Sequence, residues 1–283
     1  LGTSGMKVAL ITVSGKVLAW EVEPINLILT PDGGVEQNPE EWWQSFLRAS
    51  RRLLNHDPSA PAEVIAVCCS TQGEGTIPVD RNGNALGNCI LWMDMRGASH
   101  LHQQLRGLIN INDTDVLKLM KFIHLTGGLP SSTGKDPAAH MLFIRNTQPE
   151  VYERTFKFLN VLDYMNLKLT GEFSASYDSI VTSWVTDNRH PDAIQYHDSL
   201  IQMLGIDREK LPSLVPCTQV IGTLRHEVAE FLGLSSKTKV VAGAIDATAA
   251  AIGSGAVEFY APHLYIGTSS WIAAHVPFKK TDV

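Results

Sequence analysis

The sequence has little cysteine, and its few cysteines are not arranged for metal binding or disulfide exchange. Four are present in 283 residues, and no two of them form the Cys-x-x-Cys pair that is typical of zinc ribbons and thioredoxin-like sites. Cys68 and Cys69 are adjacent, so in a strand their side chains point to opposite faces and cannot pair with each other. These features predict reduced thiols in a cytoplasmic protein, and no residue is predicted to bind a metal ion.

Long apolar runs and an excess of positive charge are also missing. No segment reaches the roughly 20 apolar residues that a membrane-spanning helix needs, and no secretory signal peptide is recognisable. Lysine and arginine number 23 against 29 aspartates and glutamates, which gives a net charge of -6. Nucleic acids and anionic membranes attract basic surfaces, so neither is expected as a partner. The chain begins with Leu1 instead of methionine, and we expect residues to precede it.

What the sequence does contain is the composition of a globular protein. Hydrophobic residues make up 44% and charged residues 18%, which allows a sizeable core in one large domain or two ordinary ones. Periodicity and turn residues predict strands at 7–10, 17–22, 64–69, 76–79, 89–92, 239–242, 264–266 and 271–275. They predict helices from residue 39 and at 96–108, 113–123, 137–146, 164–169, 198–204, 227–232 and 246–252. This order of strands and helices is typical of the α/β class.

The start of the first helix is marked by local signals. Asn38 is a suitable N-cap, because its side chain can accept a hydrogen bond from a free backbone N–H of the first turn. Pro39 fits the first helical position, where no N–H is needed. Glu40 and Glu41 add negative charge at the positive end of the helix dipole. The sequence therefore predicts a helix that begins at residue 39.

The tripeptide Gly-Thr-Ser occurs twice, and each copy adjoins predicted strands. The copies are Gly2, Thr3 and Ser4 at the start, and Gly267, Thr268 and Ser269 near the end. Glycine lets a ligand approach the backbone closely, and nearby N–H and hydroxyl groups can line a small anion-binding hollow. One copy alone is more simply an ordinary β-turn, but two copies a whole domain apart favour a pair of phosphate-binding hairpins. Neither is a Walker A loop, since no Gly-Lys-Ser/Thr sequence follows.

Together these motifs resemble those of the FGGY carbohydrate kinases, and of the xylulokinase-like members most of all. The resemblance covers essentially the whole chain and keeps the family's order and spacing. The family's two phosphate hairpins are matched by residues 1–7 and 267–269, and the start of its first helix by residues 36–43. Its sugar-contacting segments are matched by residues 70–75 and 90–96. A structural segment is matched by residues 163–166 with 169–172, and the stretch with its catalytic aspartate by residues 241–247.

The resemblance implies a kinase of two actin-like, ribonuclease-H-like domains, in which a mixed central sheet has helices on both faces. ATP with Mg²⁺ and a sugar or polyol meet in the cleft between the domains. Residues 1–253 correspond to the N-terminal, sugar-binding domain, and residues 254–283 to the beginning of a truncated C-terminal, nucleotide-binding domain. The family has an aspartate just before the position of Leu1, so we expect the 283 residues alone to be inactive. A homodimer is one possible assembly state.

Asp246 is the candidate general base. It follows a predicted buried strand and opens an Ala-rich helix. Aspartate at such a position is most often an N-cap, and position alone leaves the two roles equally supported. The resemblance matches Asp246 to the catalytic aspartate of the family, which implies that it accepts the proton of the attacking hydroxyl during phosphoryl transfer.

Four more side chains are candidates for sugar binding. Gln72 and Glu74 lie in a glycine-rich turn after a predicted strand, and Asp94 and Arg96 follow another strand. Amide and carboxylate groups in such turns can form hydrogen bonds with sugar hydroxyls. The alternatives are a solvated loop position for Glu74 and a surface ion pair of little energetic value for Asp94 and Arg96. The resemblance implies that all four surround the sugar.

The sequence departs from the family at positions that affect the choice of substrate. Xylulokinases typically have Gln-Met-His-Gly at residues 72–75, whereas Glu74 is closer to the glycerol kinases, which have arginine in place of Gly73. His140 occupies a position where many members have lysine. Lys135 and Asp136, just before the helix predicted at 137–146, could compensate in part, although Asp136 is more simply an N-cap. Because of these departures, the sequence does not identify which sugar or polyol is the substrate.

Three functions are compatible with these observations. The first is an ATP-dependent carbohydrate kinase, and the second is a non-catalytic sugar-binding or regulatory module of the same fold. The third is an actin-like structural or chaperone ATPase. The predicted sugar-facing residues favour the first function over the third, because a filament or chaperone ATPase has no need for them.

Overall fold

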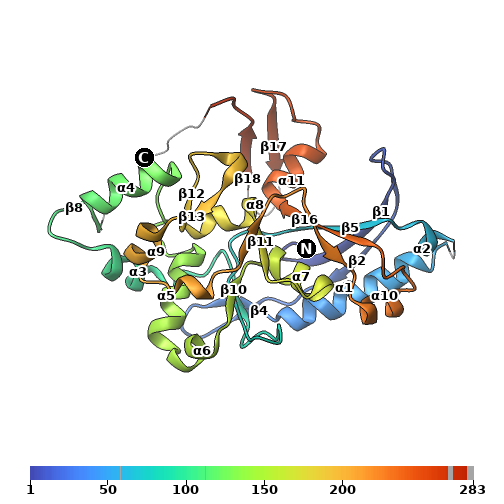
Figure 1. The fold of residues 1–283 in the computed structure, drawn as a ribbon, viewed down its shortest axis with the longest axis horizontal. Coiled ribbons are helices and arrows are strands. Elements are labelled where there is room, and N and C mark those ends of the chain that lie inside the picture. Colours follow the sequence, from blue (N-terminus) through green and yellow to red (C-terminus); the bar gives the residue numbers. More distant parts are fainter. Residues whose placement is uncertain (58, 112, 267–269, 279–283) are drawn as a thin grey trace.

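The computed structural model describes residues 1–57, 59–111, 113–266 and 270–278, and it confirms the predicted α/β class (Figure 1). The strands are β1 (Gly5–Ile11), β2 (Val17–Pro24), β3 (Ile28–Leu29), β4 (Val35–Gln37), β5 (Ala66–Thr71), β6 (Ile77–Val79), β7 (Cys89–Ile90), β8 (Asn110–Ile111), β9 (Thr114–Asp115), β10 (Lys157–Leu159), β11 (Ser174–Ser176), β12 (Thr186–Asp187), β13 (Gln195–Tyr196), β14 (Ser213–Val215), β15 (Val220–Thr223), β16 (Lys239–Ile245), β17 (Pro262–Ile266) and β18 (Ser270–Ala274). The helices are α1 (Pro39–Leu54), α2 (Ala60–Glu63), α3 (Ala98–Leu105), α4 (Val116–Thr126), α5 (Pro137–Thr147), α6 (Pro149–Arg154), α7 (Val161–Thr170), α8 (Tyr177–Ile180), α9 (Asp198–Leu204), α10 (His226–Leu232) and α11 (Asp246–Gly253).

A mixed sheet lies at the centre of the part that carries the site. β16 pairs with β5 in parallel and with β15 in antiparallel orientation. The β1–β2 hairpin forms its own antiparallel ladder, and Leu1 links it to the sheet. The amino group of Leu1 donates to the Ser70 carbonyl at 2.7 Å, and the Gln72 N–H donates to the Leu1 carbonyl at 2.7 Å.

Between β1 and β5 lies a cavity of about 690 Å³, lined by residues of both strands and of α1. The expectation of one central sheet therefore holds for β5, β15 and β16, whereas the hairpin is a separate ladder.

Two hydrophobic cores support this arrangement. In the first, α1, α7 and α10 contribute Trp42, Tyr164 and Val228, which pack with Met6 of β1 and Val240 of β16. In Figure 1, α8 and α11 lie on the opposite side of β16, so helices cover both faces of the sheet. The second core, to the left in Figure 1, is built mainly from α3, α4, α5 and α9.

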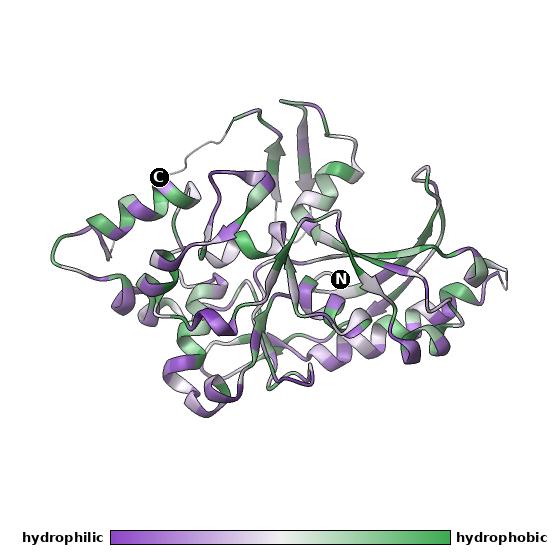
Figure 2. Cartoon of the chain, in the orientation of Figure 1, coloured by the Kyte–Doolittle hydropathy of each residue, from purple (hydrophilic) through white to green (hydrophobic). Residues whose placement is uncertain are grey.

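The structure confirms the helix start predicted at residue 39. The Asn38 side chain accepts a hydrogen bond from the Glu40 N–H at 2.9 Å. Trp42 and Phe46 are buried beneath the helix, and polar residues occupy its outer face. Figure 2 shows the same mixture of hydrophobic and hydrophilic residues along α1 and α4, which is typical of helices with one buried side. Within the described residues, no helix has the length and apolar character needed to cross a membrane.

Candidate functional site

The candidate site lies where the carboxyl ends of β5 and β16 meet. Ile245, the last residue of β16, pairs with Thr71, the last residue of β5. The two strands therefore end side by side. β5 continues into the Gln72–Glu74 turn, and β16 continues into α11, of which Asp246 is the first residue. This register brings two predicted site segments together although about 170 residues separate them in the sequence.

Asp246 lies at the start of α11 but does not occupy the helix-cap position, and its role as general base stays a prediction. The N-cap position of α11 belongs to Ile245, whose side chain cannot cap, and Asp246 occupies the first helical position. Its side chain is open to solvent. Desolvation by neighbouring protein atoms nevertheless raises the pKa of the Asp246 carboxyl, and the charge of Asp178 adds to that effect. A carboxylate with a raised pKa is a better proton acceptor than an ordinary surface aspartate.

Glu74 faces the same region from the turn after β5. Its backbone has a φ of 59°, a left-handed conformation that is uncommon for a residue with a side chain. Burial, together with the charges of Asp136 and Asp246 and against an opposing effect of Lys135, raises the pKa of the Glu74 carboxyl to about 7. Near neutral pH the carboxyl is thus partly protonated and can both accept and donate hydrogen bonds. This strained and electrostatically perturbed residue is typical of a functional position.

Gln72 is engaged inside the protein. Its Oε1 accepts from the Thr3 hydroxyl at 2.8 Å, and its Nε2 donates to Gln37 Oε1 at 2.9 Å. Gln37 in turn donates to the Thr3 carbonyl at 2.7 Å. The Gln72 amide is buried and ties the first Gly-Thr-Ser turn to the turn that carries Glu74. Direct contact between Gln72 and a sugar stays a prediction.

The first Gly-Thr-Ser turn is a tight hairpin. The Gly2 N–H donates to the Gly5 carbonyl at 3.0 Å, so that Thr3 and Ser4 occupy the two turn positions. Trp92 Nε1 donates to the Thr3 hydroxyl at 3.3 Å and joins the 90–96 segment to this hairpin.

The second turn, Gly267, Thr268 and Ser269, lies outside the described residues. The strands on either side of it, β17 and β18, pair as the predicted hairpin, with Ile266 opposite Ser270. The expectation that Ser4 and Ser269 face one cleft stays a prediction.

Asp94 and Arg96 form an ion pair, but it is not the surface pair weighed as the alternative. Asp94 is fully buried, and Arg96 donates to both of its carboxylate oxygens. Arg96 also reaches Glu36 at 2.5 Å and Asp32 at 3.1 Å. A Cβ atom on Gly34 would collide with the Arg96 guanidinium, so the chain passes closely over it. The pair is buried because this loop folds across it, and its contact with a sugar stays a prediction.

His140 connects α5 to the 90–96 segment and to Thr76, the residue directly after the 70–75 segment. Its Nδ1 lies 3.1 Å from the Thr76 hydroxyl, and its Nε2 lies 3.3 Å from the Asp94 carbonyl. Because a carbonyl can only accept, Nε2 carries the proton and Nδ1 accepts from Thr76. Complete burial lowers the pKa of His140 to about 4, so the ring is neutral. His140 therefore does not supply the positive charge of the lysine that many family members have there.

Asp136 occupies the N-cap position of α5, as expected, but its side chain makes no capping bond. It accepts a hydrogen bond from the Ser131 N–H instead. Burial raises the pKa of the Asp136 carboxyl to about 6, and its charge acts on Glu74. Asp136 is thus part of the electrostatic surroundings of the site.

Sequence reasoning gave no role to two residues that hold the site together. Gln37 bonds to both turns, and Asp178 bonds to the start of α11. Each lies at least 34 residues from its partner, so no local pattern could reveal either contact.

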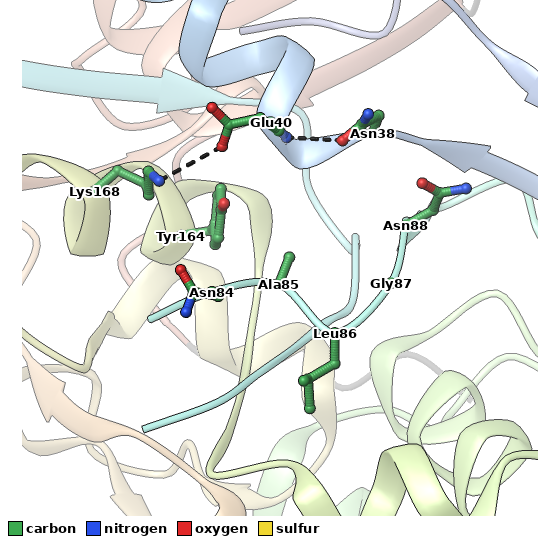
Figure 3. Close-up of a pocket in the computed structure, with 9 residues that line it drawn as sticks. All are labelled: Asn38, Glu40, Asn84, Ala85, Leu86, Gly87, Asn88, Tyr164 and Lys168. Atoms are coloured by element: carbon green, nitrogen blue, oxygen red, sulfur yellow. Dashed lines mark hydrogen bonds and ion pairs between the residues drawn. The ribbon is translucent and has the colours of Figure 1, made fainter. Parts of the chain in front are cut away.

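Two further features bear on ligands. A pocket of about 400 Å³ opens between the start of α1, residues 84–88 and α7 (Figure 3), but no predicted site residue lines it. Across the described part of the chain, no group of three or more His, Cys, Asp or Glu side chains is arranged to hold a metal ion. Because Mg²⁺ is usually held by only one or two carboxylates together with substrate phosphates, the Mg²⁺ implied by the resemblance stays a prediction.

Comparison with known proteins identifies the family. Residues 1–253 match the model of the N-terminal domain of the FGGY family of carbohydrate kinases. The chain belongs to this family, as the motifs predicted.

The relatives show how far the likeness extends. The chain is 30% identical to the xylulose kinase of Bacillus subtilis (strain 168), across 100% of the chain and 54% of that protein. It is 26% identical to the gluconokinase of the same strain, across 100% of the chain and 52% of that protein. A solved xylulose kinase from Rhodospirillum rubrum has a TM-score of 0.87 and 21% identity, covering 99% of this chain and 55% of the other. This likeness confirms the predicted fold, and the chain spans about half the length of the curated relatives it matches.

Proposed function

We propose that the complete protein transfers the γ-phosphate of ATP to a hydroxyl group of a sugar or polyol, with Asp246 as general base. The observation that carries this proposal is the meeting of Asp246 and Glu74 at the carboxyl ends of β5 and β16, within a chain of the FGGY family. One carboxylate takes the proton of the attacking hydroxyl while the other holds a neighbouring hydroxyl of the same sugar.

The other predicted residues take supporting roles in this proposal. Arg96 and Asp94 fix the 90–96 segment beside the sugar, and Gln72 fixes the turn that carries Glu74. The turns at residues 2–4 and 267–269 bind phosphate groups of ATP through backbone N–H and hydroxyl groups. Residues 1–253 form the sugar-binding domain and residues 254–283 begin the nucleotide-binding domain.

The relatives are named for a neutral sugar, xylulose, and for the anion of a sugar acid, gluconate. We take a neutral sugar as the substrate class, because the groups that act electrostatically on Glu74 are two carboxylates and a single ammonium group. A carboxylate on the substrate would be repelled by the negative charges around Glu74.

The test is Asp246→Asn in the complete protein. Asparagine keeps the size of the side chain and an oxygen that can accept the nearby Ala247 N–H, but it cannot take a proton. General-base catalysis contributes about 10²–10⁴-fold, so kcat should fall by that factor while sugar binding and the melting temperature stay close to wild type.

A matched control is Asp198→Asn, because Asp198 is the exposed first residue of α9, as Asp246 is of α11. This exchange should leave kcat unchanged. Near-normal kcat in Asp246→Asn, together with a lower melting temperature, would show that Asp246 only supports the helix and would refute the proposed mechanism.

A further inference from the structure

The helix that presents Asp246 is capped by a side chain from another part of the fold. The N-cap residue of α11 is Ile245, which has no side-chain acceptor. Asp178 of α8 supplies one instead: its Oδ2 accepts from the Ile245 N–H at 2.8 Å, and its Oδ1 accepts from the Thr248 hydroxyl at 2.9 Å. One carboxylate thus holds residues on both sides of Asp246.

Asp178 is itself held firmly. The Ser176 hydroxyl caps α8 by accepting from the Ser179 N–H at 3.2 Å. The Ser179 hydroxyl donates to Asp163, a fully buried residue that also accepts from the backbone at the start of α7. The hydrogen bonds of Ser179 thus tie α8, on which Asp178 lies, to the buried Asp163, and those of Asp178 tie α8 to the first turn of α11.

We propose that Asp178 is a positioning residue for phosphoryl transfer, which sets the first turn of α11 so that the Asp246 carboxylate reaches the attacking hydroxyl. This inference rests on the proposed function of Asp246. A general base works only within hydrogen-bond reach of its proton, and a displacement of about 1 Å can reduce a rate about 10²-fold. Without Asp178, the Ile245 N–H and the Thr248 hydroxyl lose their acceptor and the turn is free to shift.

Asp178 also acts on Asp246 through its charge. The charged side chains that interact with Asp246 are Asp178 from α8 and Glu74 from the turn after β5. Desolvation is the main cause of the raised pKa of Asp246, and the negative charge of Asp178 adds to it. Removing that charge lowers the pKa of Asp246, so the acid limb of the kcat profile should move to lower pH. A purely structural role of Asp178 would not move it.

The experiment measures kcat and both KM values of the complete protein between pH 5 and 8. In Asp178→Asn we expect kcat to fall about 10- to 100-fold, with the sugar and ATP KM values little changed and the acid limb at lower pH. Thr248→Val removes one of the two hydrogen bonds at nearly constant shape and should give a smaller fall. Thr248→Ser keeps the hydroxyl and should restore kcat to near wild type.

The matched control is Asp115→Asn. Asp115 caps α4, far from Asp246 in the fold, by accepting from the Leu117 and Lys118 N–H groups. This variant should keep the wild-type kcat and the wild-type acid limb. If Asp246→Asn abolishes turnover while Asp178→Asn and Thr248→Val both keep the wild-type kcat and acid limb, the positioning role is refuted and the proposed function survives. If Asp246→Asn itself keeps kcat, the proposed function fails.

Discussion

Glu74 has two features that destabilise the folded protein. It has a left-handed backbone conformation, and burial together with two neighbouring carboxylates raises the pKa of its side chain to about 7. The ordinary value is 4.5. The folded protein therefore binds this proton more tightly than the unfolded chain does. The free energy of unfolding therefore falls as the pH rises from about 4.5 to 7, because the Glu74 carboxylate is then ionised in a partly buried place beside other negative charges.

Glu74→Gln should remove this penalty. We expect the variant to be more stable than wild type at pH 8 by about 1–2 kcal/mol, since one pKa unit corresponds to about 1.4 kcal/mol and water screens a half-buried group. At pH 4 the wild-type carboxyl is protonated and resembles the amide, so the difference should vanish. Urea denaturation of both proteins at the two pH values measures it.

Glu172→Gln serves as the control for this experiment. Glu172 is exposed in the loop after α7, and its exchange should give no pH-dependent difference. A stability gain in Glu74→Gln that is equal at pH 4 and pH 8 would mean that ionisation of Glu74 is not its cause.

At the scale of elements, Gln37 holds together three segments that meet at the site. It is the last residue of β4 and is fully buried. Besides Thr3 and Gln72, it contacts α1, because its Oε1 also accepts from Trp42 Nε1 at 3.2 Å. The first hairpin, the turn after β5 and the start of α1 thus share one side-chain amide.

Gln37→Ala should destabilise the protein by about 2–4 kcal/mol, because it leaves the Trp42 indole N–H, the Gln72 amide and the Thr3 carbonyl without their partner in a dry environment. The shift of the denaturation midpoint in urea gives the change. Gln44→Ala on the exposed face of α1 removes only a surface bond to Glu40 and should stay within about 0.5 kcal/mol of wild type. An equally mild effect of Gln37→Ala would show that the three segments hold together without it.

The two helix starts at Asn38 and Ile245 show which local features a sequence reveals. The cap of α1 depends on Asn38 and Glu40, two residues apart, so it could be predicted. The cap of α11 depends on Asp178, 67 residues before Ile245, so Asp246 could be read only as either a base or a cap. Likewise, the Asp94–Arg96 pair was recognisable from its spacing, but its burial depends on Asp32 and the loop around it.

At the scale of the whole molecule, the order of elements predicted the α/β class, and the motifs predicted the family. The sequence did not reveal which strands bond to one another. The β1–β2 hairpin forms its own ladder, and backbone pairing of this kind leaves no periodic signal in the sequence. The site is accordingly a product of long-range register, above all of Ile245 with Thr71.

The charge of the assembled site is also a property of the whole molecule. Glu74, Asp136, Asp178 and Asp246 come from four different segments, and their charges act on one another. Arg96 does not offset them, because it is already bound to Asp32, Glu36 and Asp94. Lys135 is the cation that acts on Glu74. With the carboxylates ionised, the region therefore carries net negative charge.

We expect this charge to select neutral sugars over sugar acids. Two unit charges about 4 Å apart repel by about 1 kcal/mol even in bulk water, so the complete protein should use xylulose with a kcat/KM at least about fivefold above that for gluconate at pH 8. Added salt should narrow the gap. Asp136→Asn should narrow it as well, whereas Asp187→Asn, which removes a carboxylate paired with Arg189 away from Glu74, should not. Equal or better use of gluconate, insensitive to salt and to Asp136→Asn, would show that the carboxylates around Glu74 do not determine the substrate class.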